Sequence, residues 1–288
     1  MRIADAFNWT FQDVGKHAKD FKEVGFDAVQ LSPIQHCKEG QDWYFLFQNY
    51  DIQTIGNRLG SESDWIEACM ILRAEGLKVV TSVQLRHVAG ADNGACIPHE
   101  KVPASVAKYC KGMNGTNDRI RREVTEGHWG LPRLDYENDE LWQEHYIPFL
   151  DKVFQHSDYI RLDEGKHIGL PSEGYTIWDK IYDRYGKRMI AECINERPAI
   201  LEEYSKYCLV LTEEGPHVPR GTVRFVESHD TYLNSWGWSK HLSDAEILNR
   251  FARICKAHHN VLFYLRPFNN TAFSQRMSMI LHDPSNKC

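Results

Sequence analysis

The sequence lacks the features that mark several classes of protein. No stretch of its 288 residues is apolar for long enough to suggest a membrane span. The first residues, Met1 to Phe7, contain no charged region followed by a long apolar run, so we expect no signal peptide. Lys and Arg (34) are fewer than Asp and Glu (40), and no basic stripe is present. These absences favour a cytoplasmic protein with neither nucleic acid nor a membrane as partner. They say nothing of its oligomeric state.

Metal and disulfide patterns are also missing. The 14 histidines include no pair with zincin or zinc-finger spacing, so we expect no histidine-bound metal and no cofactor. Among the eight cysteines, those at 69, 193, 208 and 255 fall within expected helices or strands. We interpret them as buried, reduced thiols. Cys96 and Cys110 lie in a loop-rich stretch and are the one pair that we consider for a bridge.

The composition, 42% hydrophobic and 26% charged, suits one large domain with a sizeable core. Short apolar runs alternate with amphipathic helical segments, which indicates an α/β fold with parallel strands, a (β/α)₈ TIM barrel. The expected strands are Ile3–Phe7, Asp27–Leu31, Lys78–Val83, Tyr159–Leu162, Arg188–Ala191, Cys208–Leu211, Thr222–Val226 and Asn260–Leu265.

Helices are expected between these strands, three of them opened by a capping residue: Thr10 with Asp13, Ser61 with Asp64, and Ser243 with Glu246. The expected helices are 10–25, 61–76, 138–155, 177–185, 198–207, 243–258 and 273–281. Residues 88–130 hold no clear period and suggest a small subdomain inserted after strand three. About ten residues separate strands six and seven, too few for a helix and its loops, so the barrel is expected to be trimmed there. We therefore expect one barrel domain over 1–288.

Four expected strands end abruptly in charged or imidazole side chains. Lys78 to His87, Tyr159 to His167, Met189 to Glu192 and Arg224 to Asp230 all follow this pattern. In a barrel the carboxyl ends of the strands form one rim, where active sites are built. Any single strand can end in a solvated charge, but four such endings together indicate one shared site.

These segments resemble the characteristic sequence regions of the α-amylase family (glycoside hydrolase family 13), especially its animal-type members. The matching segments are Arg161-x-Asp163-x-x-Lys166-His167, Glu192 at the end of strand five, Phe225-Val-Glu-Ser-His229-Asp230, Gly130-Leu-Pro-Arg-Leu-Asp-Tyr-Glu-Asn138, Phe7-Asn-Trp-Thr, Val29-Gln-Leu-Ser-Pro33 and Trp43-Tyr-Phe-Leu-Phe-Gln48. The family's C-terminal β-sandwich is not expected, since the sequence ends soon after strand eight.

The resemblance implies a retaining glycosidase that hydrolyses α-1,4-glucans through a covalent glycosyl-enzyme intermediate. It assigns Asp163 as nucleophile, Glu192 as acid/base, and Asp230 as the carboxylate that holds sugar hydroxyls. Retention requires the Asp163 and Glu192 carboxyl groups to face each other, about 5–6 Å apart. The expected ligand is an α-glucan or maltooligosaccharide. Transfer to another sugar uses the same intermediate and stays open, as does a catalytically weak glucan-binding barrel.

The resemblance also assigns residues that bind substrate. Arg161 is expected to keep Asp163 ionised, His87 and His229 to donate to sugar hydroxyls, and Phe47 to stack on a sugar ring. The remaining expected contacts are Lys166 and His167 on the leaving-group side, and Trp43, Tyr44 and Gln48 in the aromatic segment. Trp236 and Trp238 are expected to form a sugar platform.

Other polar and aromatic residues are interpreted as structural. Strand alternation is expected to point Glu164 and Glu227 away from the neighbouring catalytic carboxylates. Trp142 and Trp178 are expected in the core or at the rim, and Cys193 in packing.

Three residues depart from the family pattern. Ser82 stands where the family has an Asp that supports the arginine beside the nucleophile. Arg86 and Arg133 stand where the family has two calcium ligands. A guanidinium offers only donors and a positive charge, so we expect no calcium ion. We expect one guanidinium to bond the carbonyls that the ion would hold, unless both arginines point to solvent.

Overall fold

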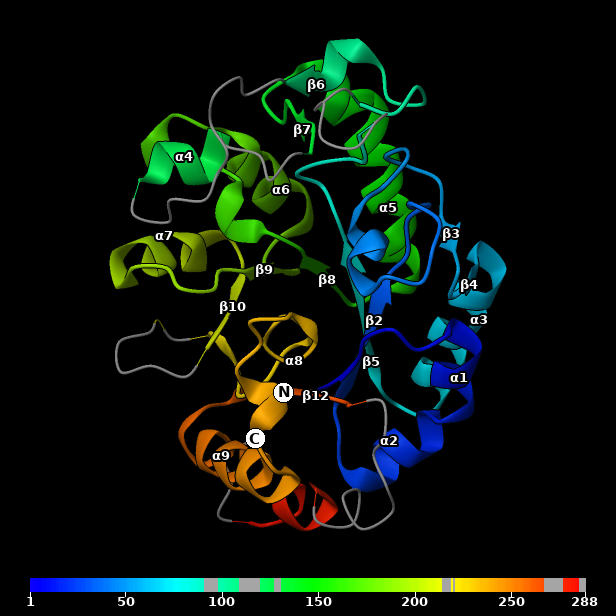
Figure 1. Ribbon diagram of the computed structural model, residues 1–288, viewed down its shortest axis with the longest axis vertical. Helices are drawn as coiled ribbons and strands as arrows, with labels where there is room; N and C mark the ends of the chain where they lie inside the picture. Colours follow the sequence, from blue (N-terminus) through cyan, green and yellow to red (C-terminus); the bar gives the residue numbers. More distant parts are fainter. Residues whose placement is uncertain are drawn as a thin grey trace.

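The computed structural model describes residues 1–90, 98–108, 120–126, 131–213, 219, 221–266 and 277–284. Eight parallel strands close into a barrel in the spatial order β1-β12-β11-β10-β9-β8-β5-β2 (Figure 1). The strands are β1 Arg2–Ala6, β2 Ala28–Pro33, β5 Lys78–Val83, β8 Tyr159–Leu162, β9 Met189–Glu192, β10 Leu209–Glu213, β11 Val223–Phe225 and β12 Asn260–Tyr264. All eight expected strands are present, with ends within two residues of those expected, and the predicted (β/α)₈ barrel is confirmed.

The inside of the barrel has an apolar layer and a polar layer. The apolar layer is one buried cluster with members on seven strands: Ile3, Ala28, Val80, Ile190, Leu211, Val223, Phe225 and Leu262. Side chains two residues apart on a strand share a face. The next inward positions after Ile3, Val80 and Ile190 are therefore Asp5, Ser82 and Glu192, and these polar side chains are buried. The barrel interior is thus apolar towards the amino ends of the strands and polar or charged at their carboxyl ends.

Helices surround the barrel, and most match their expected bounds. They are α1 Phe11–Lys16, α2 Ala18–Val24, α3 Glu62–Ala74, α5 Ile147–His156, α6 Ile177–Tyr185, α7 Pro198–Tyr207 and α9 Asp244–Ala257. A π-helical segment, η3 Leu141–Tyr146, precedes α5. The side chains of Thr10, Ser61 and Ser243 each accept a hydrogen bond from the backbone N–H three residues on, as expected.

One expected helix is wrong in detail. Residues 10–25 form two helices instead of one, because His17 leaves the helical conformation at φ −96° and ψ 8°. Gly15, two residues earlier, is a weak helix former. The second helix ends at Gly25, whose φ of +108° requires the freedom of a glycine.

Shorter elements lie in the loops. They are η1 Trp43–Phe47, β3 Gly56–Asn57, β4 Gly60–Ser61, η2 Ala104–Val106, β6 Ala107–Lys108, α4 Arg121–Glu126, β7 Arg133–Leu134, η4 Gly165–His167, η5 Pro171–Glu173, α8 His229–Leu233 and η6 Ser239–His241. Within residues 88–138, β6 pairs antiparallel with β7. The sequence did not predict α8, which begins in the loop after β11, the seventh barrel strand.

Two further expectations concern chain segments. Residues 214–222 separate β10 from β11, and 219, 221 and 222, which the structure describes, are not helical. Of the expected last helix, 277–281 is helical and 273–276 lies outside the described residues. No helix in the described ranges is long and apolar enough to cross a membrane.

The expected core residues are buried. Cys69, Cys193, Cys208 and Cys255 are buried free thiols, as predicted, whereas Cys96 and Cys110 lie outside the described residues. Trp142 and Trp178 are also buried in the core.

Candidate active site

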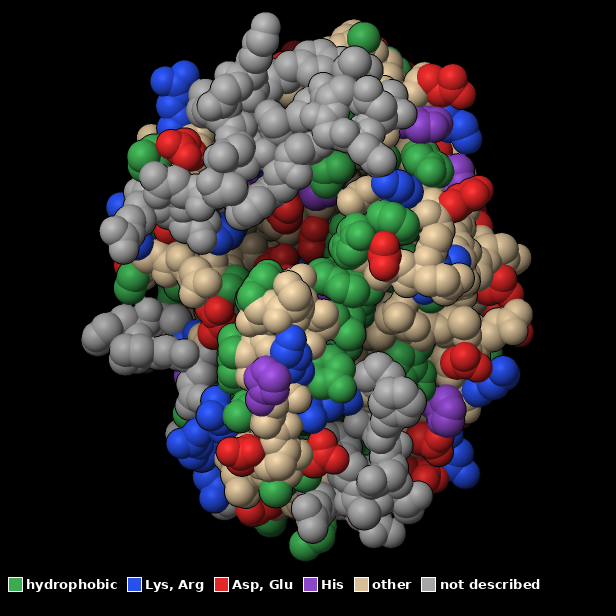
Figure 2. Space-filling model, viewed as in Figure 1, with side chains coloured by type: hydrophobic (Ala, Val, Ile, Leu, Met, Phe, Trp, Pro, Cys, Tyr) green, Lys and Arg blue, Asp and Glu red, His purple; other side chains and the backbone are tan. Residues whose placement is uncertain are grey.

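A cavity of about 430 Å³ opens at the carboxyl ends of the barrel strands. Its lining includes Glu164, Lys166, Glu192, Asp230, Trp236 and Trp238, which follow β8, β9 and β11. Figure 2 shows acidic side chains inside a hollow near the middle of this face. Three of the four charged strand endings therefore meet at this cavity, and the fourth, after β5, joins them through the hydrogen bond from Gln84 to Asp163.

Arg161, on β8, joins the two carboxylates predicted to be catalytic. Its Nη1 donates to Asp163 Oδ1 at 2.5 Å, and its Nη2 donates to Glu192 Oε1. The guanidinium is buried, at 1% exposure. One oxygen of Asp163, one oxygen of Glu192 and one ring nitrogen of His229 all lie within 4.8 Å of one another. The two carboxyl groups therefore lie at short range, while their role as a retaining pair stays a prediction.

The buried carboxyl groups of this cluster have raised pKa values. Burial raises the pKa of Asp163 well above its usual range, and the negative charge of Glu192 adds to this effect. Arg161 lowers the pKa of Asp163 and so favours its ionised form, the direction that the sequence predicts, although burial has the larger effect. Burial likewise raises the pKa of Asp230 to about 7. One guanidinium cannot balance several buried carboxylates, so the cluster holds at least one proton near neutral pH.

Asp5 and Gln84 belong to the same network and were not predicted. Gln84 Nε2 donates to Asp163 Oδ2 at 2.6 Å, so both oxygens of Asp163 are held. Burial raises the pKa of Asp5, on β1, to about 7, although Arg161 and Gln30 both lower it. The available signal was a single carboxylate inside the apolar run of the first strand. Ser82 Oγ accepts from Arg161 Nη1 at 3.4 Å, a long contact in place of a carboxylate.

His87 does not face the cavity as a free donor, contrary to prediction. Its Nε2 donates to the Phe47 carbonyl at 2.9 Å, and its Nδ1 lies 3.1 Å from Glu164 Oε2. Burial alone would raise the pKa of Glu164, but His87 and Arg86 together lower it well below its usual range. A carboxylate and a carbonyl are both acceptors, so both ring nitrogens of His87 face protein groups and not the cavity.

Glu164 was expected to point away from the site, and this is also wrong. The residue follows the end of β8 and takes a left-handed conformation, with φ of +51°. Strand alternation no longer applies there, so its side chain reaches the cavity. Its backbone N–H faces Glu192 Oε2 at 3.3 Å. Glu227 fits its structural interpretation, because it is 3% exposed and forms a two-pronged ion pair with Arg266.

The aromatic segment 43–48 packs against His229. The Phe47 ring stacks on His229 and on Phe7, with centroid distances of 5.3 and 5.7 Å, and Trp43 meets His229 edge-on at 5.5 Å. Burial lowers the pKa of His229 well below its usual range, so this imidazole is neutral.

The more exposed residues predicted to contact sugar differ in where they lie. Tyr44 is 44% exposed and donates to Asp42, and Gln48 is half-buried next to Phe47. Trp236 and Trp238 are 67% and 43% exposed and line the cavity, where the sequence predicted a platform.

Lys166 and His167 lie on the η4 turn after β8, and both line the cavity. Lys166 Nζ donates to the Ile194 carbonyl at 3.0 Å, which bridges the loops after β8 and β9. His167 is buried, its Nδ1 donates to the Val124 carbonyl at 2.7 Å, and burial lowers its pKa to about 4.

Arg86 and Arg133 do not point to solvent, since they are 0% and 1% exposed. Arg133 Nη1 donates to the Thr125 carbonyl at 2.6 Å, and its guanidinium lies 5.0 Å from the Tyr136 ring centroid. Arg86 Nε lies 3.5 Å from Glu164 Oε2. Two buried cations do not fit a calcium site. Arg133 instead bonds a backbone carbonyl of α4. That this carbonyl is one that the ion would hold stays a prediction.

The chain matches no protein-family model. It is 31% identical to an α-amylase of Clostridium acetobutylicum over 171 residues, which is 57% of this chain and 22% of that protein. It is also 31% identical to an α-amylase of Butyrivibrio fibrisolvens over 185 residues, 59% of this chain and 19% of that protein. The chain thus spans about a fifth of the length of these curated relatives.

Solved α-amylase structures share the fold. The enzyme from Geobacillus thermoleovorans, complexed with acarbose, matches with a TM-score of 0.76 at 15% identity, over 97% of this chain and 77% of that one. The α-amylase I of Eisenia fetida matches with a TM-score of 0.77 at the same identity and coverage. The fold and the rim of charged strand ends define a (β/α)₈ barrel with an amylase-like architecture. The chain thus shares the fold of solved α-amylases over 97% of its length, and part of its sequence is similar to curated α-amylases.

Proposed function

We propose that this protein is an α-amylase-like glycosidase that hydrolyses α-1,4-glucans with retention at the anomeric carbon. The observation that carries the proposal is the facing pair Asp163 and Glu192, with oxygens within 4.8 Å and a shared Arg161. Retaining glycosidases hold their two carboxyl groups closer together than inverting ones, which leave room for a water molecule between them. The α-amylase matches favour an α-glucan or maltooligosaccharide as substrate.

In the proposed mechanism Asp163 attacks the anomeric carbon while Glu192 protonates the leaving oxygen. Glu192 then removes a proton from the water that hydrolyses the glycosyl ester. Arg161 and Gln84 hold the two oxygens of Asp163 and so orient it for attack. In this proposal His229, which burial keeps neutral, and Asp230, which lines the cavity, bind sugar hydroxyls.

The test is product analysis with maltohexaose. Chromatography is expected to show shorter maltooligosaccharides, and proton NMR early in the reaction is expected to show the α-anomer as first product. A first product with β configuration would refute retention. Loss of cleavage in Asp163→Asn, with wild-type melting, is the expected control.

Transglycosylation is the second candidate, favoured by the exposed rings of Trp236 and Trp238 beside Glu192. Rings there could hold an acceptor sugar in place of water. Products longer than the starting maltohexaose would identify this activity, and their absence at high substrate concentration would exclude it.

A glucan-binding barrel with weak catalysis is the third candidate. It is favoured by Ser82, which contacts Arg161 only at 3.4 Å, and by His87, whose nitrogens both face protein acceptors. Binding of maltohexaose without detectable cleavage would support it.

We also propose that residues 1–288 form a single catalytic barrel domain in which 88–130 are a small inserted subdomain. The antiparallel pair β6 and β7 and the helix α4 support the insertion. The cytoplasmic location stays a prediction from the sequence.

A further inference from the structure

Arg121, a largely buried arginine outside the catalytic cluster, uses all of its hydrogen-bond donors. Arg121 begins α4, and its side chain is 11% exposed. Its Nε and Nη2 donate to the two oxygens of Glu173 at 2.7 and 3.0 Å, and Nη1 donates to Glu196 Oε2 at 2.8 Å. The remaining two N–H groups face the Lys166 carbonyl and the Tyr204 hydroxyl at 3.0 and 3.1 Å. A guanidinium has five N–H donors, so this one is fully satisfied.

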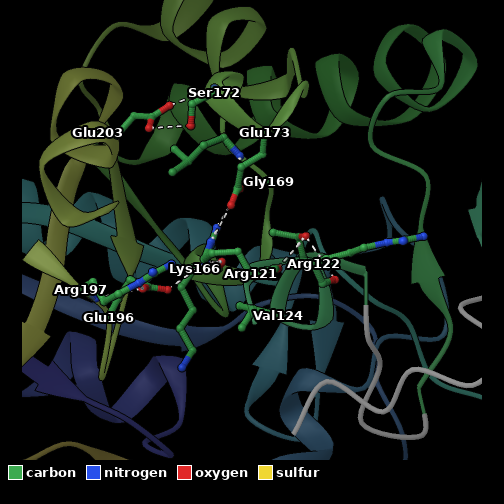
Figure 3. A network of polar contacts seen from close by, with 12 residues as sticks. Arg121, Arg122, Val124, Lys166, Gly169, Ser172, Glu173, Glu196, Arg197 and Glu203 are labelled. Carbon is green, nitrogen blue, oxygen red and sulfur yellow. Dashed lines mark hydrogen bonds and ion pairs between the residues drawn. The ribbon is translucent and has the colours of Figure 1, made fainter. Parts of the chain in front are cut away.

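These acceptors belong to separate parts of the rim. Glu173 and Lys166 lie in the loop after β8, Glu196 lies in the loop after β9, and Tyr204 lies on α7. Figure 3 shows the Arg121 side chain among Lys166, Glu173 and Glu196. Glu196 is 3% exposed, and its buried charge is compensated mainly by Arg121 at 2.8 Å and more distantly by the exposed Arg197 at 3.8 Å. Arg121 therefore joins α4 to two catalytic loops at once.

The loops that Arg121 joins carry one wall of the cavity. Lys166, Ile194 and Asn195 line it next to Glu192. The carbonyl of Lys166 is held by Arg121, while its Nζ donates to the Ile194 carbonyl. A second contact, from His167 Nδ1 to the Val124 carbonyl, fixes the same loop to α4. The position of Lys166 thus depends on α4 as well as on the barrel.

We infer that Arg121 is a positioning residue for the leaving-group side of the cavity, where it sets how the glucan beyond the cleaved bond is held. The inference rests on the proposed function. Loss of its bonds releases the loops of Lys166 and Glu196 and leaves the contacts of Arg161 with Asp163 and Glu192 in place. The kcat/KM for substrates that extend past the cleaved bond is then lowered. The kcat/KM for substrates with no sugar beyond that bond is unchanged.

Arg122 provides a matched control. It is the next residue on α4, its side chain is 74% exposed, and its Nε faces Glu126 at 3.3 Å. The same substitution at 121 and 122 changes the same residue type on the same helix. Only the substitution at 121 removes bonds to the catalytic loops.

The experiment compares Arg121→Lys with Arg122→Lys on two substrates. Maltohexaose extends on both sides of a cleaved bond, and an aryl α-maltotrioside carries only one phenol ring on the leaving side. A lysine keeps the charge beside Glu196 but cannot span all five acceptors. We expect kcat/KM for maltohexaose to fall about tenfold or more in Arg121→Lys, since small misplacements in an active site have large effects. We expect kcat/KM for the aryl substrate to stay within about twofold of wild type, and Arg122→Lys to match wild type on both.

Equal losses on both substrates, or no loss on either, would overturn the inference. Melting temperature is measured in parallel, and Glu173→Gln, which weakens the two-pronged pair but keeps Arg121, is expected to show a smaller loss of the same selectivity. If the wild type cleaves neither substrate, the proposed hydrolysis is refuted. The positioning role of Arg121 is then tested by the affinity for maltohexaose, measured by tryptophan fluorescence. Weaker binding by Arg121→Lys than by Arg122→Lys supports it, and equal binding overturns it.

Discussion

Replacing Asp5 by Asn is expected to change how the stability of the barrel depends on pH. Asp5 is 2% exposed inside the barrel, and its Oδ1 accepts from Gln30 Nε2 at 2.8 Å. Burial raises its pKa from 3.8 to about 7. An asparagine keeps the shape and the acceptor oxygen but cannot ionise. The substitution therefore isolates the cost of ionising this buried group.

The sign and size follow from proton linkage. Between pH 4 and 7 the native Asp5 still holds a proton that the unfolded chain has lost, so stability falls as pH rises through this window and levels off above it. A pKa raised from 3.8 to about 7 corresponds to about 4 kcal/mol in total, because each pH unit is worth about 1.4 kcal/mol. About 2.5 kcal/mol of this loss falls between pH 5 and pH 8.

The assay is urea unfolding followed by tryptophan fluorescence at pH 5, 6, 7 and 8. The free energy of unfolding of the wild type is expected to fall by about 2.5 kcal/mol more than that of Asp5→Asn across this range. Asp183→Asn, an exposed carboxyl on α6, is the control and should parallel the wild type. Parallel curves for wild type and Asp5→Asn would refute the reasoning that Asp5 is protonated in the folded barrel.

Three further predictions concern the site. Asp163→Asn is expected to reduce hydrolysis of an activated α-glucoside about 10³-fold or more without changing the melting temperature; unchanged turnover at unchanged melting temperature would place the nucleophile elsewhere. Addition of EDTA is expected to leave the melting temperature unchanged, because the buried Arg133 bonds the Thr125 carbonyl; a large drop that calcium restores would contradict this. Trp236→Ala is expected to raise KM for maltohexaose about fivefold, since stacking on an aromatic ring contributes about 1 kcal/mol. Tyr182→Ala on α6, also exposed, is its control, and equal KM values would exclude the platform.

Much of the barrel was predictable because local sequence carries the signal. Runs such as Lys78–Val83 and Tyr159–Leu162 are apolar, short and bounded, and both strands form with the predicted ends. The capping pairs Ser61–Asp64 and Ser243–Glu246 mark the starts of α3 and α9 for the same reason. The helix expected over 10–25 failed at His17, where the chain leaves the helical conformation between two short helices.

The sequence alone also indicated that the carboxylates at the ends of β8 and β9 meet, because parallel strands in a barrel bring their carboxyl ends to one rim. Asp163 and Glu192 required only the order of the strands to be placed together. What surrounds them depended on tertiary structure. Glu164 turns into the cavity through a left-handed backbone, and so pairs with His87, a residue 77 positions away. Arg121 collects acceptors from two loops and a helix. Such contacts are invisible to periodicity and motif, because each arises from the position of a loop or of a buried charge relative to distant segments, and only the closed barrel sets those positions.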